Sequence, residues 1–182
     1  MLEHHLRSGS RALDVGSGSG YLTVCMAEMV DKEGRVYGIE HIPELVVSAS
    51  LSQHHVTHSA HSPQLNILRA RQDHARRSAL ADRKDLLETK RLQFLEVDGF
   101  DGLPDSGPYD AIHVGAAAPS VPPALVKQLK KGGRMIIPVG PEHGSQFLMQ
   151  VDKAGDGTVK QSRMMGVRYV PLTNKSHQLG RR

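Results

Sequence analysis

The sequence predicts an α/β fold with a doubly wound, mainly parallel sheet. Short apolar runs alternate with segments of helical periodicity along most of the 182 residues, which is typical of parallel strands covered by helices. Glycine clusters follow several of the apolar runs, as expected where a buried strand turns into a helix. Right-handed crossovers then put helices on both faces, and ligands of such sheets bind beyond the carboxyl ends of the strands.

The strands are predicted from apolar runs that end at turn residues. The run Arg-Ala-Leu-Asp-Val at 11–15 ends at a glycine cluster, as a buried strand would. Asp156-Gly157 is a turn signal near an expected closing pair of strands. The predicted strands are residues 11–15, 35–40, 92–97, 109–114 and 135–139, with 147–151 and 167–170 as the closing pair.

The helices are predicted from apolar spacing and from proline and glycine. In the first helix, Leu22, Cys25, Met26 and Met29 recur at helical spacing, so we expect them to form its buried face. Proline suits the first turn of a helix and glycine its end. The predicted helices are residues 21–30, 44–50 after Pro43, 83–87, and 122–129 before Gly132-Gly133.

Length and composition indicate a single domain over residues 1–182. Apolar residues make up 38% and charged residues 23%, which is normal for a globular protein. The single cysteine excludes a disulfide framework within the chain and favours a reducing compartment, so we expect a cytoplasmic monomer. No signal peptide is evident and no apolar run approaches the ~18 residues of a membrane span. The net charge of +4 is no signature of nucleic-acid binding, and we expect neither nucleic acid nor a membrane as a partner.

Residues 52–81 interrupt the α/β pattern. Five histidines crowd there with serine, glutamine and arginine, and the periodicity is poor. We predict an inserted, flexible surface excursion. His54 and His58 lie four residues apart, but without carboxylate or thiol partners they do not make a metal site, and we predict none.

The strongest local signal is Asp14 with the three glycines that follow the first strand. Gly16, Gly18 and Gly20 allow a sharp turn and close approach to a ligand, and the next helix presents free N–H groups. The G-x-G-x-G spacing differs from the dinucleotide motif G-x-G-x-x-G. Because a carboxylate pairs with an ammonium, the loop predicts a cofactor with an amino-acid end; the alternative is an ordinary tight turn.

Two later strand ends extend this candidate site. Glu40 ends the second strand about 20 residues past the loop, where a carboxylate accepts hydrogen bonds from ribose hydroxyls. Asp98 can accept a hydrogen bond from an adenine amine, and Gly99 lets the ring lie against the backbone. The alternatives are a solvated charge for Glu40 and a plain Asp-Gly turn for the second pair.

Several stretches together resemble the protein-L-isoaspartate (D-aspartate) O-methyltransferase family. The segment Gly-Ala-Ala-Ala-Pro at 115–119 is far more specific to that family than the glycine loop. The resemblance runs from about residue 2 to residue 178 and is interrupted only by the excursion. It implies a Rossmann-like, S-adenosylmethionine-dependent methyltransferase fold. The matching stretches are residues 12–20, 38–42, 109–119, 131–140 and 165–173.

The resemblance also implies an activity and a set of binding residues. The family methylates the free carboxylate of L-isoaspartyl and D-aspartyl residues in damaged proteins, the first step of their repair. The implied cofactor-binding residues are Asp14, Gly16, Gly18 and Gly20 on the methionine side, Glu40 at the ribose, Asp98 and Gly99 at the adenine, and Thr173 and Gln178 from the carboxyl end. The implied substrate-binding residues, which hold the peptide backbone extended, are Val114, Gly115, Ala116, Ala117, Ala118 and Pro119; the alternative is a simple flexible linker.

This chemistry explains why neither a catalytic triad nor a metal site is expected. A carboxylate with a pKa near 4 is already ionised at neutral pH, and the cofactor supplies an activated methyl group. The protein must align the reactants and exclude water. Family members carry a Thr-Ile-Ser-Ala-Pro-His-type segment that meets the substrate carboxylate, and this chain begins after it, so we assign no catalytic residue.

Three questions stay open from the sequence. A cofactor-binding or interaction protein without catalysis is one alternative to the enzyme. A methyltransferase for another acceptor, such as RNA, is a second, although no aromatic acceptor motif lies near residues 110–119. Arg168 in the last expected strand is predicted to be an exposed charge, with a substrate carboxylate as its alternative partner.

Overall fold

The computed structural model describes residues 1–41 and 83–172. The predicted helix at 44–50, the excursion at 52–81, Thr173 and Gln178 lie outside the described residues.

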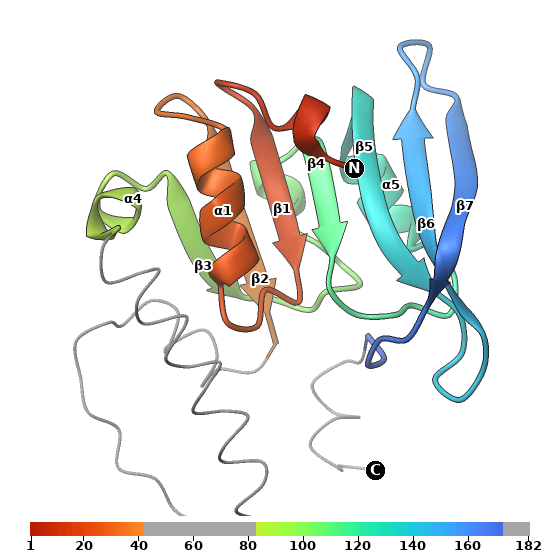
Figure 1. The fold of residues 1–182 in the computed structure, drawn as a ribbon. Helices are drawn as coiled ribbons and strands as arrows, with labels where there is room; N and C mark the ends of the chain where they lie inside the picture. The colour runs from red at the N-terminus through yellow and green to blue at the C-terminus, as the bar shows by residue number, and fades with distance from the viewer. Residues whose placement is uncertain (42–82, 173–182) are drawn as a thin grey trace, which may run out of the picture.

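Seven strands of the described residues form one sheet in the order β3-β2-β1-β4-β5-β6-β7 (Figure 1). Neighbours from β3 through β5 run parallel, whereas β6 is antiparallel to both β5 and β7. The chain reverses its direction of winding between β1 and β4, the position where open α/β sheets bind ligands. The strands are β1 Arg11–Val15, β2 Arg35–Glu40, β3 Leu92–Glu96, β4 Tyr109–Val114, β5 Leu129–Val139, β6 Gln146–Lys153 and β7 Val159–Val167.

The helices lie on both faces of this sheet, as predicted. Helix α1 (Tyr21–Met29) lies in front of the sheet in Figure 1 and α5 (Pro123–Gln128) lies behind it. Helix α4 (Lys84–Glu88) precedes β3, and short 3-10 turns occur at Glu3–His5 and Pro104–Ser106. In the described part of the chain, no helix is long and apolar enough to cross a lipid bilayer.

Successive side chains of each strand point to opposite faces of the sheet, and a hydrophobic core forms on each face. In β1, Ala12 packs in the cluster beneath α1, whereas Leu13 and Val15 pack in the larger cluster on the opposite face. Successive strand side chains point to opposite faces, so Asp14 shares the α1 face with Ala12. This placement brings Asp14 under the first helix.

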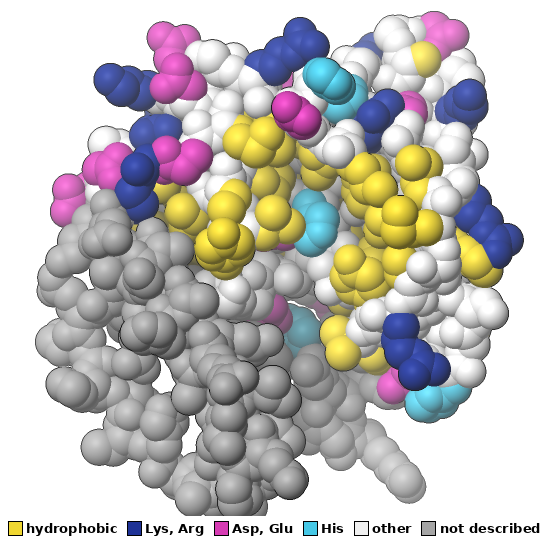
Figure 2. Space-filling view, in the orientation of Figure 1, with side chains coloured by type: hydrophobic (Ala, Val, Ile, Leu, Met, Phe, Trp, Pro, Cys, Tyr) yellow, Lys and Arg dark blue, Asp and Glu magenta, His cyan; other side chains and the backbone are white. Residues whose placement is uncertain are grey.

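The predicted buried face of α1 is confirmed for Met26 but wrong for its other three residues. Leu22 and Met29 are 41% and 42% exposed, and Cys25 is half-buried. Besides Met26, the buried side chains are Thr23, Val24, Ala27 and Val30, so the buried stripe lies next to the predicted one. Figure 2 shows hydrophobic side chains on the outer surface of α1.

The last strand also differs from the prediction. The expected strand at 167–170 is wrong, because β7 ends at Val167 and starts much earlier, at Val159. The Asp156-Gly157 turn is confirmed: the Thr158 N–H donates to Asp156 Oδ1 at 2.8 Å, and Gly157 has φ +96°. The chain therefore enters β7 directly after this turn.

Strand β5 begins earlier than predicted because of an irregularity. Leu129 pairs with Tyr109, but the next pair in register is Arg134 with Ala111. The intervening residues, which include Gly132 at φ +84°, bulge out of the ladder. The expected core of the strand at 135–139 is confirmed.

Candidate functional site

Three segments predicted to carry the site meet at one edge of the sheet. Val15, at the end of β1, pairs with Ile39 on one side and with Val114 on the other. The glycine loop, Glu40 and the loop after β4 therefore leave the sheet side by side, at the lower edge in Figure 1. This edge lies at the switch point between β1 and β4.

The glycine loop has the sharp turn that its sequence predicts. Gly16, Gly18 and Gly20 have φ values of +72°, +49° and +74°, which side chains rarely adopt. The N–H groups of Gly16 and Ser17 both donate to Ile39 O, at 2.9 and 3.1 Å. Gly20 also caps α1 against Phe94, whose ring would lie 2.7 Å from an added Cβ.

Asp14 is buried beneath this loop with two side-chain partners. The residue is 1% exposed. Thr23 Oγ1 donates to Asp14 Oδ2 at 2.6 Å, and His113 Nδ1 lies 2.8 Å from Asp14 Oδ1. The carboxylate thus joins β1, α1 and β4. An ionised carboxylate offers about four acceptor positions, so these two contacts leave capacity for a ligand.

Thr23 and His113 were not among the residues predicted for the site. The signal for His113 was present, because Asp14 and His113 each stand one residue before the end of adjacent parallel strands and pair in register. The signal for Thr23 was its spacing along α1, which places it on the stripe that faces the sheet.

Glu40 contacts the glycine loop directly. The Gly18 N–H donates to Glu40 Oε2 at 3.2 Å, and the His41 N–H donates to Oε1 at 2.9 Å. His41 Nδ1 lies 3.2 Å from the same Oε1. Two residues predicted separately as cofactor ligands are therefore in contact, and Glu40 is only 7% exposed.

Asp98 and Gly99 lie just beyond β3, at the same edge. Val97 N donates to Glu40 O at 3.2 Å, which brings this segment beside the end of β2. Asp98 Oδ1 accepts from Phe100 N at 2.9 Å, so the predicted turn is present. An added Cβ at Gly99 would lie 2.9 Å from methyl groups of both Leu172 and Val15, so these side chains pack closely against the glycine.

The loop at 114–119 is pinned on one side by the segment after β7. Ala117 N donates to Val170 O, and Leu172 N donates to Ala117 O, both at 2.8 Å. Ala117 is 2% exposed. These two bonds fix the position of Ala117 against the segment after β7.

The end of β5 pins the same loop on its other side. Ala118 N donates to Pro138 O at 3.0 Å, and Gly140 N donates to Ala118 O at 2.9 Å. The backbone N–H and C=O of Ala118 are therefore both hydrogen-bonded within the protein, as are those of Ala117. Of the loop, Pro119 is exposed and Gly115 half-buried, while Val114 and the three alanines are buried.

The two loops touch through their backbones. A Cβ added to Gly115 would lie 3.0 Å from Gly16 O, closer than most real contacts of this kind. Gly115 N also donates to Val15 O at 2.8 Å. The loop predicted to hold a cofactor and the loop predicted to hold a substrate are therefore in direct contact.

These residues fit a nucleoside cofactor with an amino-acid end. The left-handed glycines bring bare backbone to the edge of the sheet, and two buried carboxylates, Asp14 and Glu40, flank it. Within residues 1–41 and 83–172, no group of three or more His, Cys, Asp or Glu side chains could hold a metal ion.

Comparisons with known proteins agree on one family. The sequence model described as Protein-L-isoaspartate(D-aspartate) O-methyltransferase (PCMT) matches residues 1–177. A protein-L-isoaspartate O-methyltransferase of Triticum aestivum is 48% identical over 179 residues, which are 98% of this chain and 66% of that protein. One of Caenorhabditis elegans is 44% identical over 180 residues, 99% of this chain and 68% of its own. The chain thus spans about two thirds of the length of these relatives.

A solved structure supports the same relationship. Its description names a protein-L-isoaspartate O-methyltransferase (PCMT) from Plasmodium falciparum in complex with S-adenosyl-L-homocysteine. It superposes with a TM-score of 0.70 at 30% sequence identity and covers 96% of this chain and 70% of its own. The Rossmann-like methyltransferase fold expected from the sequence is confirmed.

Proposed function

Because the chain belongs to the protein-L-isoaspartate(D-aspartate) O-methyltransferase family, we propose that it methylates damaged aspartyl residues in proteins. The methyl group comes from S-adenosylmethionine, and the acceptor is the free carboxylate of L-isoaspartyl or D-aspartyl residues. The names of the relatives favour this enzyme over a cofactor-binding protein without catalysis.

The contact between Gly16 and Gly115 is the observation that carries the proposal. Methyl transfer requires the acceptor oxygen, the methyl carbon and the sulfur to be aligned within van der Waals reach. Two loops that meet backbone to backbone, with no side chain between them, allow donor and acceptor to approach that closely. Residues 114–119, here called the acceptor loop, are hydrogen-bonded to the segment after β7 and to the end of β5. These bonds hold the geometry before a ligand binds.

The residues of this chain bind and orient rather than exchange protons. S-adenosylmethionine, when bound, supplies a methyl group that is already electrophilic, and the acceptor carboxylate is ionised at neutral pH. Asp14 contributes negative charge toward the ammonium of the cofactor, and Glu40 accepts from its ribose. Asp98 and Gly99 serve the adenine, and Gly16, Gly18 and Gly20 leave room for the methionine part. Thr173 and Gln178 complete the proposed set from outside the described residues.

The acceptor loop makes its substrate contacts through its two ends. Since the peptide groups of Ala117 and Ala118 are already hydrogen-bonded, a substrate strand cannot pair with them unless those bonds break. Gly115 and Pro119 stay accessible, and the buried Val114, Ala116, Ala117 and Ala118 form the floor beneath the peptide. An extended substrate backbone therefore crosses the loop instead of extending its ladder.

We further propose that residues 1–182 act as one methyltransferase domain, monomeric and cytoplasmic, with neither nucleic acid nor membrane as partner. Support comes from the single, unpaired Cys25 and from the modest net charge of +4. Isoaspartyl-containing peptides and proteins are the partners of the site.

Calorimetry with S-adenosylhomocysteine, followed by a methyl-transfer assay in the same sample, tests the proposal. We expect binding, and formation of a methyl ester on an isoaspartyl peptide after S-adenosylmethionine is added. Binding without any ester would assign the chain to a cofactor-binding role. The absence of binding would contradict the cofactor site itself.

A further inference from the structure

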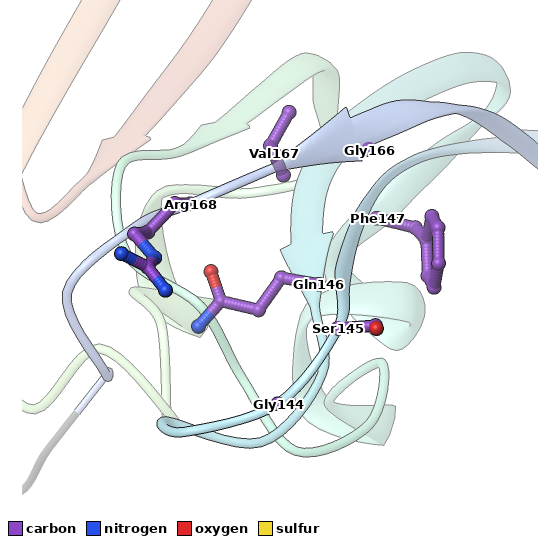
Figure 3. Close-up of a pocket in the computed structure, with 7 residues that line it drawn as sticks. All are labelled: Gly144, Ser145, Gln146, Phe147, Gly166, Val167 and Arg168. Carbon is purple, nitrogen blue, oxygen red and sulfur yellow. The ribbon is translucent and has the colours of Figure 1, made fainter.

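A shallow, open recess lies at the β7 edge of the sheet, where the β5–β6 connection meets the end of β7 (Figure 3). Its volume is about 480 Å³, and it is lined by residues 144–147 and 166–168. None of these lining residues belongs to the cofactor loop or to the acceptor loop. The recess is therefore a separate candidate for binding.

Gln146 fixes the walls of the recess. Its side-chain Nε2 donates to Pro141 O and to Tyr169 O, both at 3.2 Å, and its Oε1 accepts from Tyr169 N at 2.7 Å. Gln146 is 3% exposed, so these bonds form away from water. Both amide protons are used, and Gln146 holds the β5–β6 connection against the residues that follow β7.

Arg168 is the charged group of the recess. It is exposed, and in Figure 3 its guanidinium lies on the same side as the Gln146 side chain, whereas Phe147 points the other way. Across the described residues, Arg168 has no hydrogen bond or ion pair through its side chain, while the nearby Arg163 lies over the Phe147 ring at 3.0 Å. No carboxylate lines the recess, although the exposed Glu142 lies in the same connection.

The charged residues of β7 and of the segment that follows it are all basic. Residues 159–172 include Lys160, Arg163 and Arg168 and contain no aspartate or glutamate. An exposed guanidinium that has no carboxylate partner within residues 1–41 and 83–172 favours an anion, and its planar fork fits a carboxylate with two parallel hydrogen bonds.

The recess is also connected to the acceptor loop. Val170, two residues beyond Arg168, accepts the hydrogen bond of Ala117 N. An extended chain advances about 3.3 Å per residue, so a peptide at the acceptor loop reaches Arg168 within a few residues. A ligand of the recess and a ligand of the acceptor loop can thus be parts of one polypeptide.

We propose that Arg168 and this recess form a subsite for a second carboxylate of the substrate polypeptide, a few residues from the one that is methylated. The proposal rests on the proposed function to the extent that the polypeptide is the isoaspartyl substrate. An aspartate or glutamate side chain and a chain-terminal carboxylate share the required chemistry. The site therefore selects acidic peptides over neutral ones of the same length.

Fluorescence anisotropy with labelled isoaspartyl peptides, in the presence of S-adenosylhomocysteine, tests the subsite. The peptides carry glutamate or glutamine at one flanking position and end in an amide; a third is the glutamine peptide with a free carboxyl terminus. We expect the glutamate peptide to bind about tenfold more tightly than the glutamine peptide at low salt, a difference of roughly 1.4 kcal/mol. Arg168→Gln should abolish the preference, and Arg168→Lys should keep part of it.

Lys160→Gln is the matched control, because Lys160 is an exposed cation of β7 outside the recess, and Arg168 directly follows the end of that strand. It should leave the preference unchanged. A preference of the native chain for the free carboxyl terminus alone, lost in Arg168→Gln, would assign the subsite to terminal carboxylates. The proposal is overturned if the native chain shows no preference for any carboxylate, or if Arg168→Gln weakens all three peptides equally.

Methyl-ester formation in the same preparations separates this proposal from the proposed function. A glutamate preference that depends on Arg168, without any methyl ester, would contradict the proposed methyltransferase activity and support the peptide subsite. Ester formation without a carboxylate preference would contradict the subsite and support the proposed methyltransferase activity.

Discussion

At the scale of single residues, two buried carboxylates hold the cofactor edge together. Asp14 connects β1 to α1 and β4 through Thr23 and His113, and Glu40 connects β2 to the backbone of the glycine loop. Buried carboxylates are stable only when they accept hydrogen bonds, so each position depends on its partners. Both residues therefore shape the site before they contact a ligand.

Substitution of Glu40 should weaken cofactor binding. Glu40→Gln removes the charge that accepts from Gly18 and His41, and hydrogen bonds to a charged group contribute roughly 1.5–3 kcal/mol. We expect the Kd for S-adenosylhomocysteine, measured by calorimetry, to rise about 10- to 100-fold. Glu96→Gln is the control, because Glu96 is exposed and pairs with Glu40 in register on β3. An equal loss in both variants would contradict a specific role of Glu40.

Thr23 should contribute mainly to stability. Thr23→Val keeps the shape of the side chain but removes a donor from the buried Asp14, which should cost about 1–3 kcal/mol of unfolding free energy. Urea denaturation followed by circular dichroism measures this loss. The exposed Thr89, whose hydroxyl donates to Asp85 O, provides the control Thr89→Val, with an effect within about 0.5 kcal/mol. Equal losses of unfolding free energy in Thr23→Val and Thr89→Val would contradict a specific stabilising role of the hydrogen bond from Thr23 to the buried Asp14.

At the scale of elements, the acceptor loop is a short extended segment held between two others. Ala117 pairs with the residues after β7 and Ala118 with the end of β5, so the loop acts as a rigid floor beside the glycine loop. A Cβ at Gly115 would lie 3.0 Å from Gly16 O, which is tighter than most real contacts of this kind. Small displacements of this segment should therefore affect alignment more than folding.

Gly115→Ala should reduce methyl transfer. The new Cβ would lie 3.0 Å from Gly16 O, so one of the two backbones must move. Because a displacement of about 1 Å can cost on the order of 100-fold in rate, we expect this smaller shift to lower kcat/KM about three- to tenfold. Gly155→Ala, in the β6–β7 turn, is the control, since nothing lies within 4 Å of its added Cβ. Unchanged kcat/KM in Gly115→Ala would argue against alignment through this contact.

The ion pair between Arg134 on β5 and Asp152 on β6 should make the folding stability depend on pH at acidic values. Burial raises the pKa of Asp152, but hydrogen bonds from Arg134 and Gln150 outweigh it and hold the pKa below the ordinary value of 3.8. A lowered folded pKa contributes stability above the unfolded value, and this contribution is lost as the pH falls through the folded value. Asp152→Asn should therefore be less stable than the native chain at pH 7.

Urea denaturation at a series of pH values checks this expectation. The difference between the native chain and Asp152→Asn should shrink as the pH falls below about 4. Glu142→Gln, at an exposed site in the adjoining connection, should show little difference at any pH. A constant difference for Asp152→Asn down to low pH would exclude the ionised pair as its cause.

At the scale of the whole molecule, sequence patterns predict the buried parallel strands best. The bounds of β1, β2 and β4 are confirmed, because an apolar run that ends at glycine or an acidic residue leaves few alternatives. Strand β7 was misplaced because it is an edge strand whose residues are mostly exposed, so no apolar run marks it. The inward stripe of α1 was misplaced because apolar residues occupy both its buried and its exposed sides.

The contacts that organise the site depend on residues distant in sequence. Asp14 and His113 are 99 positions apart, and the partners of Ala117 lie beyond β7. Motifs predicted which segments gather at the sheet edge, but only the strand order brings particular atoms together. The hydrogen bonds that pin the acceptor loop and that join Glu40 to Gly18 could not be predicted from local patterns.

The most direct test of the central claim is a methylation assay on two peptides of the same sequence that differ in one linkage. One peptide contains an L-isoaspartyl residue and the other contains an ordinary L-aspartyl residue. After incubation with S-adenosylmethionine, mass spectrometry measures the methyl ester on each. We predict ester on the isoaspartyl peptide and none above background on the aspartyl peptide. Equal methylation of both peptides, or ester on neither while the cofactor binds, would contradict the account.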